Sequence, residues 1–235
     1  VDTDKKEKVQ VILKNVSITN EEGAGICVEQ TDKAFITLAD GSINKIVSNS
    51  FSENEDTNID GAIFSREDLT LNGSGTLKLA SSAHGIVSKD DLVLTGGVYQ
   101  IESEKQGLSG KESVRIADGT FTITSGTDAI HSEDTDEDTK GFIYIAGGVL
   151  TLDAGGDGIS SSYVVQADGG NFDISKDGKD IMIGFNPKFL IDALRVIDDE
   201  EIDIYLVNPK APCFIKDATE SYIYLILPVN FTTVS

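Results

Sequence analysis

The chain has 235 residues with 40 acidic and 19 basic side chains, which give a formal net charge of −21 at pH 7. Such a negative surface argues against nonspecific binding of nucleic acid, so we expect no nucleic-acid partner. The two cysteines, Cys27 and Cys213, lie too far apart to indicate a disulfide framework or a metal motif. No apolar run approaches the roughly 18 residues of a membrane-spanning helix, so we expect no membrane span.

Short strand patterns with irregular spacing occupy the first 64 residues. Residues 9–13 and 16–18 are rich in β-branched residues, which is typical of strands. Two pairs, Gly25-Ile26 and Ala62-Ile63, combine a small residue with an isoleucine, and Asp40-Gly41 fits a turn. This part of the chain therefore belongs to the same fold as the more regular part that follows it.

A 22-residue repeat organises the middle of the chain. Ile86, Leu108 and Ile130 are spaced 22 residues apart, Ile159 follows after 29, and Ile181 after 22 more. A fixed period of this length indicates a solenoid. Glycines keep the same period and predict turns with positive φ: Gly75, Gly97, Gly119, Gly148 and Gly170.

Each repeat contains three short strand patterns and leaves no room for a helix. Apolar and polar residues alternate after each glycine, which indicates strands with one buried face. We therefore predict an all-β fold in which residues 8–178 form a right-handed parallel β-helix, with rungs about 4.8 Å apart. One predicted core column consists of Leu77, Tyr99, Phe121, Leu150 and Phe172.

Charged residues form two predicted outward columns. Arg66, Lys89 and Lys111 occupy one register. The next register holds Glu67, Asp90 and Glu112, with Asp134 as a fourth member. Stacked acids repel one another unless cations lie between them. Two interpretations stay open: the columns neutralise each other in solvent, or the basic column binds substrate carboxylates while the acidic column holds Ca²⁺.

An acidic excursion, residues 133–140, accounts for the longer 29-residue step. Closely spaced carboxylates on a loop can supply the six to eight oxygen ligands that Ca²⁺ prefers. A hydrated acidic loop is the alternative, and the spacing does not match an EF-hand. We predict a calcium site, with Ca²⁺ as the cofactor, formed by Asp128, Glu133, Asp134, Asp136, Asp138 and Asp157.

Arg115 and Tyr144 are expected one rung apart on an outward strand column. An arginine can bind a carboxylate through two hydrogen bonds, and a tyrosine ring can stack on a sugar. Together with Arg66, Lys89 and Lys111 they are our predicted carbohydrate-binding residues. The histidines, His84 and His131, fall in different columns, and no catalytic triad or facing carboxylate pair can be identified, so we expect no enzyme activity.

The pattern changes near residue 179. Asn186-Pro187 predicts the start of a helix over about 187–197, which we expect to pack through Phe189, Leu190, Ala193 and Leu194 onto a small sheet. Strand patterns follow at 202–207, around 214–215 and at 222–229, giving a β-α-β-β-β segment. Residues 179–235 carry 5 basic and 9 acidic side chains, a net −4 that leaves −17 on the preceding residues.

Several stretches of the first part, residues 31–41, 65–70, 85–92 and 157–159, carry a family resemblance. Through them, residues of about 8–178 resemble the calcium-associated carbohydrate-binding domain of clostridial surface proteins, a parallel β-helix related in shape to pectate lyases. The resemblance implies non-catalytic, calcium-dependent binding of plant cell-wall polysaccharide, notably polygalacturonate (pectin) and also cellulose. A pectate-lyase-like lyase is the enzyme alternative.

Residues 183–194 and 222–229 resemble the last half-domain of the bacterial DNA polymerase III β sliding clamp. The chain departs from that family at Asn230 and Phe231, where clamps usually have arginine and leucine. Because the other clamp domains are missing, we expect no ring and no DNA affinity. A clamp fragment in a chimeric protein remains an alternative.

We therefore predict two domains, residues 1–178 and 179–235, the second covering the open end of the β-helix. We expect a monomer whose partner is an acidic polysaccharide. The β-helix part implies an extracellular or cell-surface location, whereas the clamp-like part, if it dictates the location, implies the cytoplasm.

Overall fold

A computed structural model of the chain describes residues 1–52, 58–137 and 139–176, together with residues 188, 189, 193, 195, 203–205, 212–216 and 223–227. The chain divides into two compact units, Val1–Asp177 and Gly178–Ser235. Among the helical residues that the structure describes, none belongs to a helix of the length and apolarity that crossing a membrane requires.

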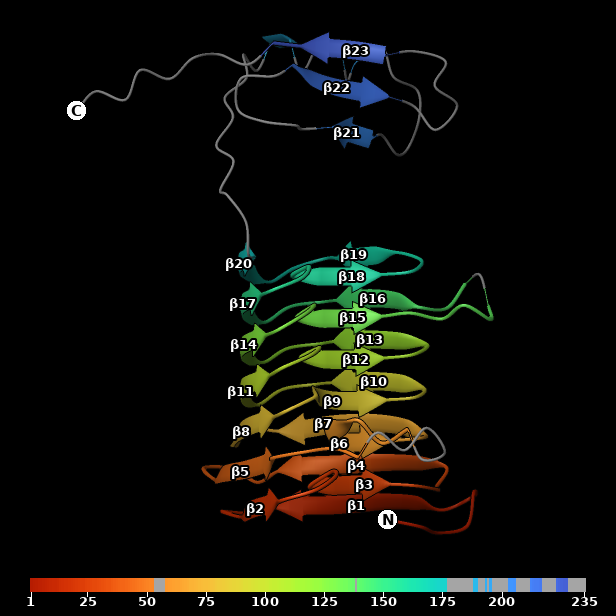
Figure 1. Ribbon diagram of the computed structural model, residues 1–235, viewed down its shortest axis with the longest axis vertical. Helices are drawn as coiled ribbons and strands as arrows, with labels where there is room; N and C mark the ends of the chain where they lie inside the picture. Colours follow the sequence, from red (N-terminus) through yellow and green to blue (C-terminus); the bar gives the residue numbers. More distant parts are fainter. Residues whose placement is uncertain are drawn as a thin grey trace, which may run out of the picture. The chain divides into compact units, whose positions relative to one another are not determined.

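The first unit is a parallel β-helix built from three sheets, as predicted (Figure 1). The first sheet contains β1 (Lys8–Leu13), β4 (Lys33–Leu38), β7 (Asp68–Gly73), β10 (Asp91–Leu94), β13 (Ser113–Ile116), β16 (Phe142–Ile145) and β19 (Val165–Ala167). The second contains β2 (Ser17–Asn20), β5 (Ile43–Ser48), β8 (Thr76–Ser81), β11 (Val98–Ser103), β14 (Thr120–Ser125), β17 (Val149–Ala154) and β20 (Asn171–Lys176). The third contains β3 (Ile26–Val28), β6 (Gly61–Ser65), β9 (His84–Ser88), β12 (Leu108–Gly110), β15 (Ile130–Ser132) and β18 (Ile159–Ser161).

Inward side chains stack in the predicted columns. Strand registers align Leu77 with Tyr99, Phe121, Leu150 and Phe172, and the first four are fully buried. The rings of Tyr99 and Phe121 are parallel, with centroids 4.8 Å apart. Phe172 was expected to be buried but is 40 % exposed, because β20 is the last strand of its sheet and, among the described strands, pairs only with β17.

On the rung before Leu77, the core column contains a polar residue that was not predicted from the sequence. Asn44 aligns with Leu77 and is fully buried. Its Nδ2 donates to Ser42 Oγ and to the Thr76 carbonyl, at 2.9 and 3.2 Å, and its Oδ1 accepts from the Val16 amide at 3.2 Å. The buried amide is therefore satisfied, which removes most of the cost of placing it in an apolar core.

Glycines at the turn before the second sheet have two physical roles. Gly97 and Gly119 have φ values of +104° and +136°. A Cβ at Gly119 would also lie 2.9 Å from the Phe121 ring, so the glycine leaves room for the stacked aromatic. The prediction for Gly75 is wrong, because Gly73 has the positive φ in that turn, +98°.

Serines end several strands of the second and third sheets. Ser81 and Ser125 finish strands of the second sheet, and Ser65 and Ser88 finish strands of the third. Ser125 Oγ donates to the Thr127 carbonyl at 2.9 Å and Ser65 Oγ to the Glu67 carbonyl at 2.7 Å. These local bonds offer the backbone an alternative to continuing the strand, and so they fix where the chain turns.

The second unit contains a three-stranded antiparallel sheet in the order β21 (Asp203–Tyr205), β22 (Cys213–Lys216) and β23 (Ile223–Ile226). Lys188, Phe189 and Ala193 have helical backbone, whereas Arg195, also within the predicted helix, lies in a turn; the other residues of the predicted helix lie outside the described residues. Ala193 packs with Cys213, Ile215 and Ile226. Phe189, which we expected to pack as well, is 57 % exposed.

The core column gives a direct test of the stack. Phe121→Ala should lower the free energy of unfolding of the β-helix by about 3–5 kcal/mol, because it removes a fully buried ring and leaves a cavity. Phe172→Ala in the same column is the matched control and should cost clearly less, since its ring is 40 % exposed. Urea unfolding followed by circular dichroism measures both. Equal losses would show that the two positions are equally buried.

Candidate functional site

The predicted basic column lies at the corner that follows the third sheet. Arg66, Lys89 and Lys111 come directly after β6, β9 and β12. Their stacking is visible in the backbone, where the Lys89 amide donates to the Ser65 carbonyl at 2.8 Å and the Lys111 amide to the Ser88 carbonyl at 3.0 Å. The sequence therefore located this column correctly.

Each member of the basic column already has an acidic partner. Arg66 Nε lies 2.8 Å from Glu29 Oε2, and Lys89 Nζ lies 3.5 Å from Asp60 Oδ1. Lys111 Nζ lies 2.7 Å from Asp136 Oδ2. A sugar carboxylate that binds at this column must therefore compete with these pairs.

The acidic column stacks beside it. The Glu112 amide donates to the Asp90 carbonyl at 3.3 Å, so these two acids occupy consecutive rungs. Burial, with the nearby Glu112 and Asp68 carboxylates, raises the pKa of Asp90 to about 6. Glu112 pairs with Lys140, whereas no described lysine or arginine forms an ion pair with Asp90. Asp90 is thus a carboxylate whose charge is not compensated.

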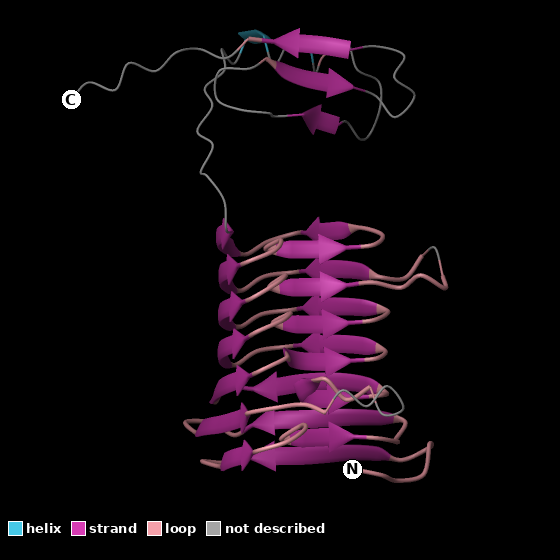
Figure 2. Cartoon of the chain, viewed as in Figure 1, coloured by secondary structure: helices cyan, strands magenta, loops and turns pink. Residues whose placement is uncertain are grey.

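The acidic loop between β15 and β16 projects from the stack (Figure 2). Asp134 is buried, and its Oδ1 accepts hydrogen bonds from the Asp136 and Glu137 amides at 2.7 and 3.2 Å. These bonds lower the pKa of Asp134. Lys111 approaches Asp134 and Asp136, and Lys140 pairs with Glu137 at 2.7 Å. Two lysines therefore neutralise much of the loop.

The remaining predicted calcium ligands gather elsewhere, around a histidine. Asp128 and Asp157 lie on consecutive rungs, as predicted, and the Asp157 amide donates to Asp128 Oδ1 at 2.8 Å. Asp128 Oδ2 lies 2.9 Å from His131 Nδ1, and Glu133 Oε2 lies 3.6 Å from His131 Nε2. Asp138 lies outside the described residues.

The predicted ligand set therefore does not converge. Asp134 and Asp136 face Lys111, whereas Asp128 and Glu133 face His131. Among the residues that the structure describes, no three His, Cys, Asp or Glu side chains form a group that could hold a metal ion. The equivalent placement of Asp128 and Asp157 was predicted correctly, but the pairing of the other acids with Lys111 and His131 was not.

Arg115 and Tyr144 are direct neighbours across β13 and β16, as predicted. The Arg115 guanidinium bonds both Asp91 carboxylate oxygens, at 3.2 and 3.0 Å, and lies 5.2 Å from the centroid of the Phe142 ring. Tyr144 Oη donates to Asp168 Oδ2 at 2.8 Å, which raises the pKa of Tyr144. Both side chains are held in place by acids on the outer face of the first sheet.

The histidines lie in different columns, as predicted, and each has a hydrogen-bond partner. His84 Nδ1 accepts a hydrogen bond from the Gln106 amide at 3.3 Å. Burial lowers the pKa of His84 to about 4, so its ring is neutral at physiological pH. This accounts for His84 without a catalytic role.

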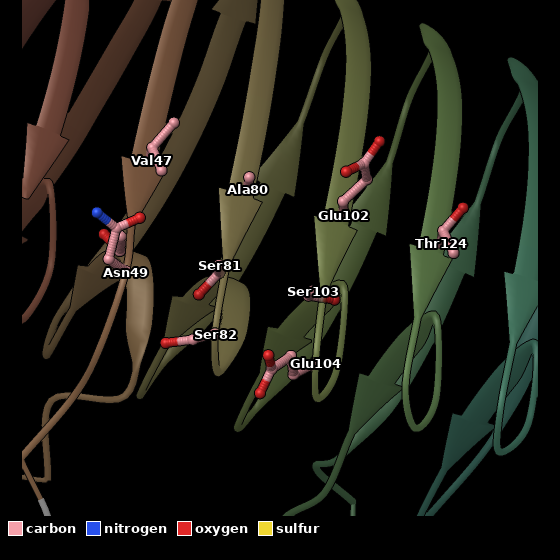
Figure 3. A pocket seen from close by; sticks show the side chains of 10 residues that line it. Val47, Asn49, Ala80, Ser81, Ser82, Glu102, Ser103, Glu104 and Thr124 are labelled. Carbon is pink, nitrogen blue, oxygen red and sulfur yellow. The ribbon is translucent and has the colours of Figure 1, made fainter.

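A groove on the outer face of the second sheet was not found from the sequence. It has a volume of about 490 Å³ and runs over the ends of β5, β8, β11 and β14 (Figure 3). An adjoining hollow of about 460 Å³ shares Val47, Ala80 and Glu102 with it and reaches Lys45, Lys78 and Gln100. The sequence signal that could have located this groove is the short side chain of Ala80 between larger residues in one outward column.

Comparison with known proteins agrees with this architecture. A solved structure, that of the polysaccharide lyase-like protein from C. thermocellum, a gadolinium derivative, is 32 % identical with a TM-score of 0.63 and covers 76 % of each chain. A carbohydrate-binding domain-containing protein of Acetivibrio thermocellus is 35 % identical over 107 residues, which are 44 % of this chain and 37 % of that protein. This chain thus spans little more than a third of that relative.

A second similarity is shorter. The β sliding clamp of Lactococcus lactis is 39 % identical over 59 residues, which are 24 % of this chain and only 16 % of the clamp. The relation to clamps is therefore partial. The family model for carbohydrate-binding domain-containing proteins, in contrast, matches residues 1–202, and the chain belongs to this family.

Proposed function

We propose that the β-helix binds an acidic polysaccharide such as polygalacturonate, with Ca²⁺ bridging carboxylates of the protein and of the sugar. The observation that carries the proposal is the stacked pair Asp90 and Glu112 beside the basic column, where the pKa of Asp90 is raised to about 6. A divalent cation between the Asp90 and Glu112 carboxylates would relieve their mutual repulsion, as a proton shared by the two does.

Calcium dependence follows from the charge of the molecule. The first 178 residues carry a net −17, so an anionic chain is repelled unless cations lie between the two polyanions. Ca²⁺ takes six to eight oxygen ligands. A bridging ion needs only some of them from the protein, because sugar carboxylates and water supply the others. Such a site is completed by the ligand, which is consistent with the absence of a three-residue cluster among the described residues.

The basic groups then have a role in ligand exchange. When Ca²⁺ neutralises the carboxylates that pair with Lys111 and Arg115, these two basic side chains become available to sugar carboxylates. A ligand of this kind lies outside cells, so we propose a cell-surface or extracellular location.

Polysaccharide lyase activity is the second candidate, favoured by the polysaccharide lyase-like relative. β-Elimination needs a base near the proton that is removed. Arg115, the arginine of the outward column, is bound by both oxygens of Asp91, so it is poorly placed for this role. Incubation with polygalacturonate should give no rise in ultraviolet absorbance; a rise from unsaturated product would establish the lyase.

The first prediction concerns calcium. Isothermal titration with polygalacturonate should show binding with calcium and none with chelator. Calcium alone should raise the melting temperature, since a ligand at a hundredfold excess over its Kd stabilises the folded state by about 2.7 kcal/mol. The double variant Asp90→Asn with Glu112→Gln should lose both effects.

Two further variants locate the ion. The loop variant Asp134→Asn, Asp136→Asn and Asp138→Asn removes three of the six ligands predicted from the sequence and should keep the calcium response. Asp173→Asn, an exposed acid on β20, controls for the loss of charge. If the loop variant alone abolishes the response, the ion binds at the loop, and the Asp90–Glu112 position is wrong.

The second prediction concerns pH. Because the folded-state pKa of Asp90, about 6, exceeds its reference value of 3.8, ionising Asp90 destabilises the fold increasingly as the pH rises from about 4 to about 6. Asp90→Asn should therefore match the wild type below pH 4 and be more stable above pH 6. Since the group is partly exposed, the gain is on the order of 1 kcal/mol. Urea unfolding at several pH values measures it, and an equal effect at pH 3.5 would contradict it.

A further inference from the structure

We infer that the groove on the outer face of the second sheet is a separate binding site for an uncharged, extended polysaccharide chain, and that this site works without calcium. The groove lies on a different sheet from Arg115 and Tyr144, which belong to the first sheet, and away from the basic column, which follows the third. It therefore goes beyond the calcium-dependent site proposed above.

The charged groups of the groove differ from those at the other sites. Two lysines, Lys45 and Lys78, and two acids, Glu102 and Glu104, line the two hollows. None of these four side chains forms an ion pair or a side-chain hydrogen bond with another described residue. At the predicted carbohydrate site, in contrast, Arg66, Lys89, Lys111 and Arg115 are all paired with acids. The groove thus has hydrogen-bonding groups ready for a ligand.

The charges of the groove also select the kind of ligand. Its two lysines and two glutamates cancel, although the β-helix as a whole is strongly acidic. An anionic chain would lie directly against Glu102 and Glu104. No stacked acid pair such as Asp90 and Glu112, which could hold a bridging divalent ion, lines the groove. Sugar hydroxyls, in contrast, can donate to carboxylates and accept from ammonium groups. An uncharged, hydroxyl-rich ligand fits this lining best.

The spacing of the strands along the groove matches the repeat length of a polysaccharide chain. It crosses four consecutive strands of one parallel sheet, β5, β8, β11 and β14, which are about 4.8 Å apart. This spacing is close to the advance per sugar of an extended pyranose chain. A polysaccharide aligned with the axis of the β-helix would therefore place one sugar on each rung and meet equivalent backbone positions along its length.

The shape of the groove depends on one short side chain. Val47, Ala80, Glu102 and Thr124 occupy one outward column on consecutive rungs. Figure 3 shows Ala80 as the low point between Val47 and Glu102. The methyl groups of Val47 and Ala80 give an apolar floor for the face of a sugar ring, with the charged and hydroxyl groups around it.

The experiment is isothermal titration of the full chain with uncharged β-1,4-linked hexasaccharides of xylose, mannose and glucose, in chelator. At least one should bind, with the same affinity when calcium is added. Ala80→Phe fills the low point of the groove and should weaken this binding by at least about tenfold. Glu102→Gln with Glu104→Gln removes charged acceptors and should weaken it by about tenfold as well.

The matched control is Val149→Phe. It adds a ring of the same size to the same sheet on β17, at an exposed position outside the groove, and should leave the affinity unchanged. Circular dichroism shows whether both variants fold. The inference is overturned if none of the hexasaccharides binds, if Ala80→Phe and Val149→Phe weaken binding equally, or if chelator abolishes binding. Calcium-dependent binding of polygalacturonate should survive Ala80→Phe, so the two proposals can fail independently.

Discussion

The parallel backbone pairing between rungs is the constraint on which the rest of this molecule depends. Each strand bonds to its counterparts in the rungs before and after it, and this fixes the spacing at one strand separation and the register at one residue. Like positions in the sequence therefore lie on top of one another. The chain cannot change this distance locally, so each column must consist of side chains that tolerate a close copy of themselves.

Apolar and charged columns respond to that distance in opposite ways. Tyr99 and Phe121 lie parallel at 4.8 Å and gain contact. Carboxylates at the same spacing repel, and burial together with the nearby Glu112 raises the pKa of Asp90 to about 6. Several acids avoid the repulsion by pairing with basic side chains, as Asp91 does with Arg115 and Asp136 with Lys111. A stacked acid without such a partner is where a cation stabilises the fold most.

The 22-residue period made the buried columns predictable from the sequence, but it did not determine much of the outer surface. Where the repeat is regular, alignment of Ile86, Leu108 and Ile130 follows from counting residues, and the strands pair in that register. The acidic loop has no such rule: Lys140 pairs with Glu137 and His131 lies near Glu133, and the positions of Lys140, Glu137 and Glu133 depend on how the insertion folds back. The groove was missed for a similar reason, because it begins at β5, in the irregular first rungs, and because a hollow depends on side-chain size as well as register.

A solenoid can keep two ligand sites electrically independent, because its columns are fixed by the backbone and not by each other. The acidic face acts on an anionic polymer through a field that at physiological ionic strength fades over about 8 Å. Salt therefore both screens the repulsion there and weakens the bridging by calcium. The groove has cancelling charges, and an uncharged glycan carries none, so neither effect reaches it. The two sites that we propose on one rigid framework would therefore respond differently to ions.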